Sequence, residues 1–248
     1  RVHRHLVPRL PRPAERGARL RERPILTIDG PSGAGKTTVS RRLAERASLT
    51  RLDTGAMYRA CALSARRAGI PWSDGVRLGR LCADLPIAFR PGEGGEMRIT
   101  LSGEDVSEAI RTPGISMGAS EVSVHMPVRE AMVSLQRKIG ERGGVVLEGR
   151  DTGTVVFPDA EGKFFLDAAA AVRARRRFLE WGEREKRPFG EVLKEVLRRD
   201  IQDSTREHSP LRVAEGAVYI DTTTLTVEQV VDEMLRRLPE PARKGIPG

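Results

Sequence analysis

The chain has 248 residues and a formal net charge of +9, and 39% of its residues are hydrophobic and 31% charged. This length suits one large α/β domain with an insertion. Because no apolar run approaches the roughly 20 residues that a membrane span needs, we expect no membrane partner. The two cysteines, Cys61 and Cys82, form no C-x-x-C pair, and we expect them to be core thiols of a cytoplasmic protein.

Most of the positive charge lies in residues 1–24, which carry eight Arg and two Glu, a balance of +6 that leaves +3 for the rest. This segment has four prolines, no long apolar run and no Phe, Trp or Tyr to stack on bases, so we expect a disordered tail. We expect neither a secretory signal, because the segment lacks an apolar core, nor a transit peptide, because it lacks Ser. The mildly basic remainder argues against a nucleic-acid partner.

The first expected strand, residues 25–29, leads into a phosphate-binding loop. Gly30, Gly35, Lys36 and Thr37 fit the pattern G-x-x-x-x-G-K-[ST]. Glycines allow successive backbone N–H groups to curve around a phosphate, and the helix that follows directs its positive end toward the same anion. In this pattern the lysine adds a full charge near the β- and γ-phosphates, and the threonine hydroxyl can bind Mg²⁺. The residues that we expect to bind ATP are Gly30, Pro31, Ser32, Gly33, Ala34, Gly35, Lys36, Thr37 and Thr38.

The rest of the chain alternates between helix and strand patterns. In chain order we expect a helix over 37–47, a strand over 49–52, a helix from 54 to 68 with Thr54 as its N-cap, a helix over 121–140, strands over 145–148 and 163–166, helices over 169–181 and 189–203, a strand over 218–221 and a helix over 226–237.

Residues 72–115 have a different pattern. Two strand-like runs, 85–90 and 97–101, flank a Pro- and Gly-rich turn at 91–95, which predicts a β-hairpin. A hairpin does not belong to a parallel βαβ core, so we assign 72–115 to a small inserted β-subdomain.

Strands that alternate with helices predict an α/β domain with a doubly wound, parallel, five-stranded sheet over residues 25–238, followed by a flexible tail over 239–248. In such sheets, ligands bind beyond the carboxyl ends of the strands. Gly30, Asp53 and Arg150 all follow strands at that edge, so we expect them to share one cleft.

Arginine is a second indication of phosphate chemistry, because a guanidinium binds phosphate through two parallel hydrogen bonds and keeps its charge when buried. The arginines that could face the cleft are Arg59, Arg129, Arg150, Arg199 and Arg206. Arg173 and Arg175 to Arg177 follow the fourth strand, where a solvated helix face is an equally good interpretation. Glu148 ends an apolar strand and could hold a water on Mg²⁺, or it could accept a hydrogen bond from a neighbouring backbone N–H.

Several stretches carry a resemblance to a known family. They are residues 28–36, 52–59, 103–107, 110–112, 126–130, 149–158 and 199–203. Together they resemble the bacterial cytidylate kinases, nucleoside monophosphate kinases that phosphorylate CMP and dCMP, over about residues 25–238. The phosphate loop alone is generic, whereas the 149–158 run together with the inserted β-subdomain is specific. The sequence departs from the family at Thr37, where many relatives have Gly or Ser, and at Glu148, which replaces the usual Asp.

The resemblance implies a Mg²⁺-dependent transfer of the ATP γ-phosphoryl group, with an Arg-bearing helical lid at about residues 169–190. It implies that the CMP phosphate meets Arg59, Arg150 and Arg206, the ribose meets Arg199 and Asp203, and the cytosine meets Ser120, Arg129 and Asp151. Asp53 and Thr54 complete the expected CMP site, and the expected metal ligands are Thr37 and Glu148. As catalytic residues we select Lys36, Arg150, Asp151 and Arg176.

Two other functions remain open at this point. The chain could be a phosphate-loop kinase of another small acceptor, which a panel of acceptors would decide. It could also be a phosphate-loop protein that binds nucleic acid through its basic tail, with an affinity that falls steeply with salt. Our interpretation is a cytoplasmic monomer that acts on ATP and CMP or dCMP.

Overall fold

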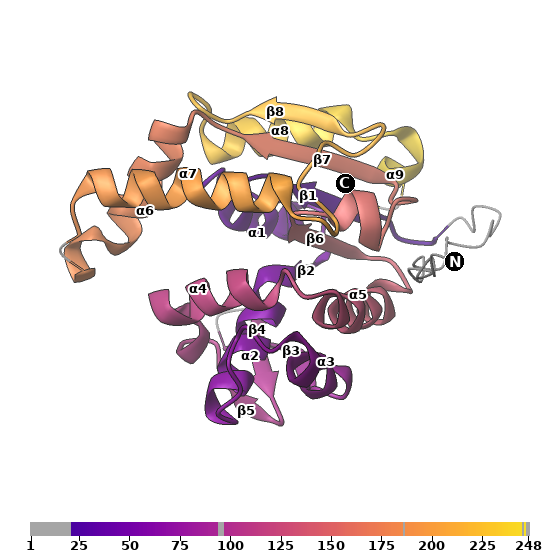
Figure 1. Cartoon of the computed structure of the whole chain (residues 1–248). Helices are drawn as coiled ribbons and strands as arrows, with labels where there is room; N and C mark the ends of the chain where they lie inside the picture. Colours follow the sequence, from indigo (N-terminus) through magenta and orange to yellow (C-terminus); the bar gives the residue numbers. More distant parts are fainter. Residues whose placement is uncertain (1–20, 94–96, 186, 245, 247–248) are drawn as a thin grey trace, which may run out of the picture.

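The computed structural model describes residues 21–93, 97–185, 187–244 and 246 (Figure 1). Within these residues, a parallel sheet of five strands has the order β2-β6-β1-β7-β8. Its strands are β1 (Ile25–Asp29), β2 (Thr50–Asp53), β6 (Val145–Gly149), β7 (Gly162–Asp167) and β8 (Val218–Asp221). The doubly wound fold that the sequence predicts is therefore confirmed.

Alternate residues of the central strands supply the two faces of this sheet. On β1, Ile25 packs into one apolar cluster, while Leu26 and Ile28 pack into another. Residues of α1 (Lys36–Arg46) and α8 (Val227–Arg237) cover the Leu26 face, and residues of α2 (Thr54–Arg67) and α5 (Met126–Gly140) cover the opposite face. Burial on both faces explains why these strands read as continuous apolar runs.

A second, antiparallel sheet lies apart from the parallel one (Figure 1). Its strands are β3 (Ile87–Pro91), β4 (Met97–Leu101) and the short β5 (Glu104–Asp105). The register Ile87↔Leu101 confirms the predicted hairpin, and β5 adds a pairing that the sequence pattern did not indicate. Next to it lies α3 (Gly75–Ala83).

The predicted helix over 121–140 is confirmed over residues 126–140, but its start is wrong, because a separate helix ends at Val122. The two helices are α4 (Pro113–Val122) and α5, and His125 between them has an extended backbone. Pro127 lies in the first turn of α5, where its missing N–H would have no intrahelical acceptor, whereas the interior of a longer helix would not tolerate it. The expected N-cap of α2 also moves by one residue, because the Asp53 carboxylate, not the Thr54 hydroxyl, accepts from the Ala56 N–H at 2.9 Å.

The remaining elements complete the chain. They are the short helical turn η1 (Ala109–Arg111), the π-helical turn η2 (Thr152–Val156), α6 (Ala170–Glu185), α7 (Phe189–Thr205) and α9 (Glu240–Lys244). Figure 1 shows α6 and α7 side by side. Ala242 of α9 is fully buried in the cluster under α1 and α8, so the expected flexible tail at 239–248 is in part a helix packed on the core.

Most of the expected basic tail lies outside the described residues. Its last part does contact the core. The Arg21 guanidinium lies 2.7 Å from a carboxylate oxygen of Asp159 and 2.9 Å from one of Glu161. The boundary at residue 24 is therefore too late, because ion pairs already hold residue 21.

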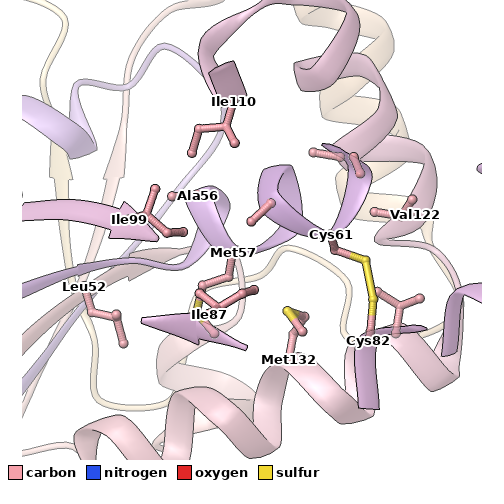
Figure 2. Packing of buried hydrophobic residues seen from close by; sticks show 14 of the residues in the cluster. Leu52, Ala56, Met57, Cys61, Cys82, Ile87, Ile99, Ile110, Val122 and Met132 are labelled. Carbon is pink, nitrogen blue, oxygen red and sulfur yellow. A yellow bond between two sulfur atoms is a disulfide. The ribbon is translucent and has the colours of Figure 1, made fainter. Parts of the chain in front are cut away.

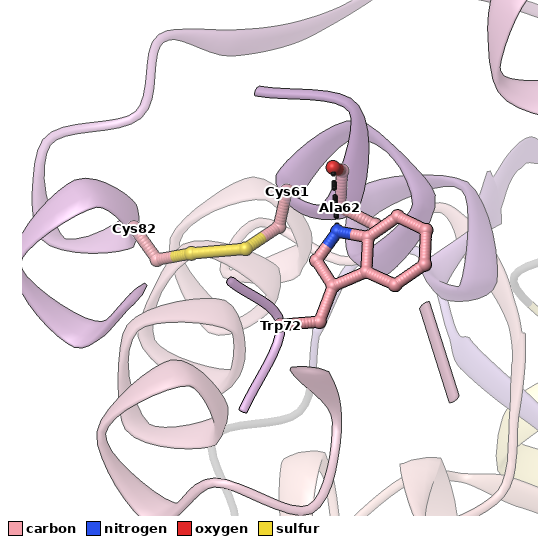
Figure 3. The surroundings of a disulfide bond; sticks show 4 residues. All are labelled: Cys61, Ala62, Trp72 and Cys82. Carbon is pink, nitrogen blue, oxygen red and sulfur yellow. Dashed lines mark hydrogen bonds between the residues drawn. A yellow bond between two sulfur atoms is a disulfide. The ribbon is translucent and has the colours of Figure 1, made fainter. Parts of the chain in front are cut away.

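Cys61 and Cys82 are buried as predicted, but they form a disulfide instead of two free thiols (Figure 3). The bond joins α2 to α3, with the two Cα atoms 6.4 Å apart. The chain between these helices turns back, and the indole N–H of Trp72 in this turn donates to the Ala62 carbonyl at 3.1 Å. Figure 2 shows the disulfide beside Met132 and Val122 in the apolar cluster. The sequence separation of 21 residues between the two cysteines did not predict this pairing, because the pairing depends on how α3 packs on α2.

Candidate active site

A cavity of about 1110 Å³ opens at the carboxyl edge of the parallel sheet, between the phosphate loop and the α2–α4 region. Nearly every residue that the sequence analysis selected lines this cavity. The predicted residues that line it are Ser32, Gly33, Ala34, Gly35, Lys36, Thr37, Thr38, Asp53, Thr54, Arg59, Ser120, Arg129, Glu148, Arg150, Asp151, Arg176, Arg199, Asp203 and Arg206. Gly30 and Pro31 belong to the loop without lining the cavity.

The glycines of the loop are required by close packing. A Cβ atom at Gly30, which has φ 147°, would lie 1.9 Å from the Leu166 carbonyl oxygen. A Cβ at Gly33, with φ 79°, would lie 2.8 Å from the Arg173 carbonyl oxygen. No side chain caps the N-terminus of α1, which begins at Lys36 after Gly35, so the helix directs its first N–H groups toward the loop. These features fit an anion held in the loop.

Lys36 lies under this loop. Its ammonium group donates to the Pro31 carbonyl at 2.7 Å, and the side chain is buried. Burial, together with the positive charge of Arg150, lowers the pKa of Lys36 well below its ordinary value. A phosphate in the loop would supply the missing negative charge and favour the ammonium form.

Thr37 and Glu148 lie together, as a metal site at this position requires. The Thr37 hydroxyl donates to Glu148 Oε2 at 2.9 Å, and Glu148 is 3% exposed. Among the described residues, no three His, Cys, Asp or Glu side chains are close enough to form a metal site of their own. One carboxylate and one hydroxyl nevertheless fit Mg²⁺, which keeps several waters and takes its other ligands from the phosphates of a substrate.

The Arg129 and Asp151 side chains form a buried ion pair on the other side of the cavity. A second Arg129 nitrogen donates to the Ser123 carbonyl at 3.1 Å, and the guanidinium carbon lies 5.8 Å from the centroid of the Tyr58 ring. Arg206 Nη2 lies 4.0 Å from the other Asp151 oxygen. The structure therefore brings Arg206 to the pair expected at the cytosine.

Asp203 and Arg150 form a second pair, with Arg150 Nε donating to Asp203 Oδ2 at 2.7 Å. Burial favours the neutral carboxyl, but the charges of Arg150 and Arg199 prevail and hold the pKa of Asp203 below its ordinary value. Burial and the neighbouring Arg150 lower the pKa of Arg199 to about 10.

Four arginines of the cavity retain unused donors. Among the described residues, the buried nitrogens without a hydrogen-bond acceptor include Arg59 Nε, Arg129 Nε, Arg199 Nε and Arg206 Nη2. A buried cationic donor without a partner is costly, because it has lost water and gained nothing in return. Convergence of four such groups on one cavity fits an anionic ligand that is rich in acceptors.

The arginines of α6 divide into two groups. Arg176 lines the cavity and donates to the Thr222 carbonyl at 2.7 Å, and Arg177 lines it as well. Arg173 is instead tied to both Asp200 oxygens, at 2.9 and 2.7 Å, and does not line the cavity. Arg175 is exposed. The solvated-face interpretation thus holds for Arg175, whereas Arg173 joins α6 to α7.

Sequence reasoning missed two residues of this region. Asp29 is buried and accepts from Thr152 N at 2.9 Å, Thr152 Oγ1 at 2.8 Å and Gly153 N at 2.8 Å, so it holds the turn that follows Asp151. Burial raises the pKa of Asp29 to about 6. Arg51 pairs with Glu148 and lines the cavity. Its strand position was a usable signal, because residues 51 and 53 point to the same side of a strand.

The comparisons with known proteins agree with this geometry. The family model described as cytidylate kinase matches residues 26–240. The chain belongs to the cytidylate kinase family. It is 52% identical to a cytidylate kinase of Geobacter sp. (strain M21), over 90% of this chain and 96% of that protein. It is 53% identical to one of Syntrophotalea carbinolica, over 87% of this chain and 92% of that protein. A cytidylate kinase of Solibacter usitatus is 47% identical, over 87% of this chain and 92% of that protein.

Membership of the cytidylate kinase family confirms the resemblance found in the sequence and makes the protein a phosphotransferase. None of the helices in the described residues combines the length and apolar character that a transmembrane segment requires.

Proposed function

We propose that this protein transfers the γ-phosphoryl group of ATP to CMP and dCMP. The observation that carries the proposal is the pairing of a phosphate loop with unused arginine donors across one cavity. Phosphoryl transfer needs two phosphate groups held in line and their charge neutralised. In the reaction, an oxygen of the CMP phosphate bonds to the γ-phosphorus, the bond to the β-phosphate oxygen breaks, and ADP leaves with the electron pair.

On the donor side, the loop over residues 30–38 binds the ATP phosphates through its backbone N–H groups. Lys36 stabilises the charge that develops on the transferring group, and Arg176 approaches from α6. Thr37 and Glu148 would hold Mg²⁺, which supplies further charge neutralisation when bound. The contact between these two side chains supports this assignment.

On the acceptor side, we assign Arg59, Arg150 and Arg206 to the phosphate of CMP and Arg199 and Asp203 to its ribose. We assign Ser120, Arg129 and Asp151 to the cytosine. Asp53 and Thr54 support this side through the start of α2. The close approach of Arg206 to Asp151 supports a role for Arg206 between phosphate and base.

Several further properties belong to the same proposal. Residues 72–115 would form the acceptor-binding subdomain and residues 169–190 a lid over the donor. We propose that the protein acts as a cytoplasmic monomer without a nucleic-acid partner. Ile99 and Ser107 in the cavity wall support the role of the inserted segment, and Arg176 supports that of α6.

An ADP-release assay across CMP, dCMP, UMP, AMP, GMP and shikimate tests the proposal. We expect kcat/KM to be highest for CMP and dCMP, and to depend on added Mg²⁺. A higher value for shikimate or for a purine nucleotide would reject CMP as the substrate while leaving the phosphate loop as the donor site.

A further inference from the structure

Arg51 is a charged residue of the cavity that neither the motif nor the assigned roles use. It lies on β2, where the register places Asp53 beside Glu148 of the neighbouring strand β6. Its guanidinium is mostly buried, with 16% of the side chain exposed. Arg51 Nε donates to Glu148 Oε1 at 2.9 Å, and Arg51 Nη2 also contacts that oxygen. The same Nη2 lies 3.6 Å from Asp53 Oδ2.

Each of these two carboxylates has a partner in a different half of the cavity. The second oxygen of Glu148 accepts from the Thr37 hydroxyl of the phosphate loop at 2.9 Å. Asp53 Oδ2 accepts from Arg59 Nη2 at 2.9 Å, and Arg59 has a buried Nε without an acceptor. A continuous chain of contacts therefore runs from Thr37 through Glu148, Arg51 and Asp53 to Arg59.

The charges along this chain alternate in sign, so a change at one end alters the balance at the other. Thr37 and Glu148 would hold a cation that binds with ATP, and Arg51 would then share the Glu148 carboxylate with a second positive charge. Arg51 then retains Asp53 as its charged partner, together with the Ser40 hydroxyl, to which Arg51 Nε donates at 2.9 Å. Asp53 holds Arg59 less strongly in consequence, and Arg59 has more capacity for the phosphate of the acceptor.

We propose that Arg51 is a positioning residue that couples the two halves of the site, so that binding of ATP and binding of CMP strengthen each other. This inference rests on the proposed function, because it takes the loop as the donor site and Arg59 as an acceptor ligand. A coupling free energy between two sites is reciprocal, so the effect must be the same whichever nucleotide is added first.

Calorimetric titration of the full chain with CMP, with and without Mg²⁺ and a non-hydrolysable ATP analogue, measures this coupling directly. We expect the analogue to tighten CMP binding about fivefold or more in the parent protein, the lower end of usual coupling factors. In Arg51→Met, which keeps an aliphatic stem but no charge, we expect the factor to fall to within about twofold of one. In Arg51→Lys, which keeps the charge but not the fork, we expect an intermediate factor.

Arg67→Met is the matched control. Arg67 also lies at a helix–strand contact, pairs with Glu104 through hydrogen bonds of 2.7 and 2.8 Å, and does not line the cavity. We expect its coupling factor to equal that of the parent. Titration of the analogue with and without CMP must give the same factors.

A parent factor near one, or an unchanged factor in Arg51→Met, would overturn the coupling. If Arg51→Met does not fold, the factor in Arg51→Lys decides, and equality with the parent would overturn it. The proposed function is tested separately, because the ADP-release assay with the panel of acceptors uses only the parent protein. If the parent phosphorylates CMP but shows no coupling between the two nucleotides, the proposed function stands and only the coupling role of Arg51 is rejected.

Discussion

The donor and acceptor halves of the cavity are built in different ways. The donor half is built mainly from one continuous segment, residues 30–38, that presents backbone N–H groups and one buried lysine, and Glu148 and Arg176 are its additions from distant elements. The acceptor half draws side chains from β2, α2, α4, α5, the turn after β6, and α7. There, carboxylates hold several of the arginines in place. A local chain conformation thus defines the first half, and long-range ion pairs define the second.

In the donor half, we expect the largest effect from Lys36→Met. The ammonium group should matter more in the transition state, where charge gathers on the transferring group, than in ground-state ATP binding. We expect kcat to fall by about 10²-fold or more, the usual scale for one preorganised electrostatic contact. Steady-state kinetics with saturating ATP and CMP measure it.

Lys163→Met is the control for this variant. Lys163 also donates to the carbonyl of a proline five residues earlier, Pro158, at 3.0 Å, but it does not line the cavity. Its kcat should stay near that of the parent. Activity of Lys36→Met within a few-fold of the parent would remove Lys36 from the mechanism.

Helix α7 serves both halves, so it can separate them. Asp203 pairs with Arg150 on the acceptor side, and Asp200 pairs with Arg173, which also donates to the Ser32 carbonyl of the loop at 3.2 Å. Asp203→Ala leaves the Arg150 guanidinium without its carboxylate and should cost about 2 kcal/mol of acceptor binding. We therefore expect KM to rise roughly 30-fold for CMP and dCMP, and to stay within about twofold for ATP.

Asp200→Ala should show the opposite pattern, with KM raised for ATP and nearly unchanged for CMP. Initial rates with one substrate varied and the other saturating give all four values. If KM for ATP rises as much as KM for CMP in Asp203→Ala, this part of α7 belongs to the donor half and the ribose assignment is wrong.

The specificity of the acceptor half is tested at Asp151. An acceptor that faces the N4 amino group favours cytosine and meets a lone pair on uracil, which leaves a buried polar group unpaired. We expect the parent to prefer CMP over UMP in kcat/KM. In Asp151→Asn, whose amide can turn its NH₂ toward O4, we expect that ratio to narrow by about tenfold, near the low end for one base contact.

Asp159→Asn is a useful control for this variant, because it removes a carboxylate from an exposed ion pair with Arg21 outside the cavity. Its CMP to UMP ratio should equal that of the parent. An unchanged ratio in Asp151→Asn, even with lower activity, would mean that Asp151 acts on Arg129 and Arg206 without reading the base.

The two halves also differ in what the sequence revealed. The phosphate loop was predictable residue by residue, because its pattern depends on contiguous backbone geometry. The partners of the acceptor arginines were not, because Arg129 meets Asp151, and Arg150 meets Asp203, only after distant elements pack. The start of α5 near Pro127 was readable from local chemistry, yet the apolar spacing around it favoured one long helix.

The last prediction concerns the disulfide that joins α2 to α3, and it has the smallest expected effect on catalysis. Neither Cys61 nor Cys82 lines the cavity, so reduction should change kcat/KM by less than about twofold. With a sequence separation of 21 residues, the chain-entropy model gives a loss of about 3 kcal/mol on reduction.

For a chain of this length, that loss corresponds to a Tm lower by roughly 6–12 °C. Thermal unfolding with and without dithiothreitol, with the free thiols counted in both samples, measures it. A double variant, Cys61→Ala with Cys82→Ala, should have a Tm near that of the reduced parent, and dithiothreitol should not change it. A parent whose Tm does not move when both thiols become countable would show that packing among α2, α3 and Trp72, and not the covalent bond, holds these helices together.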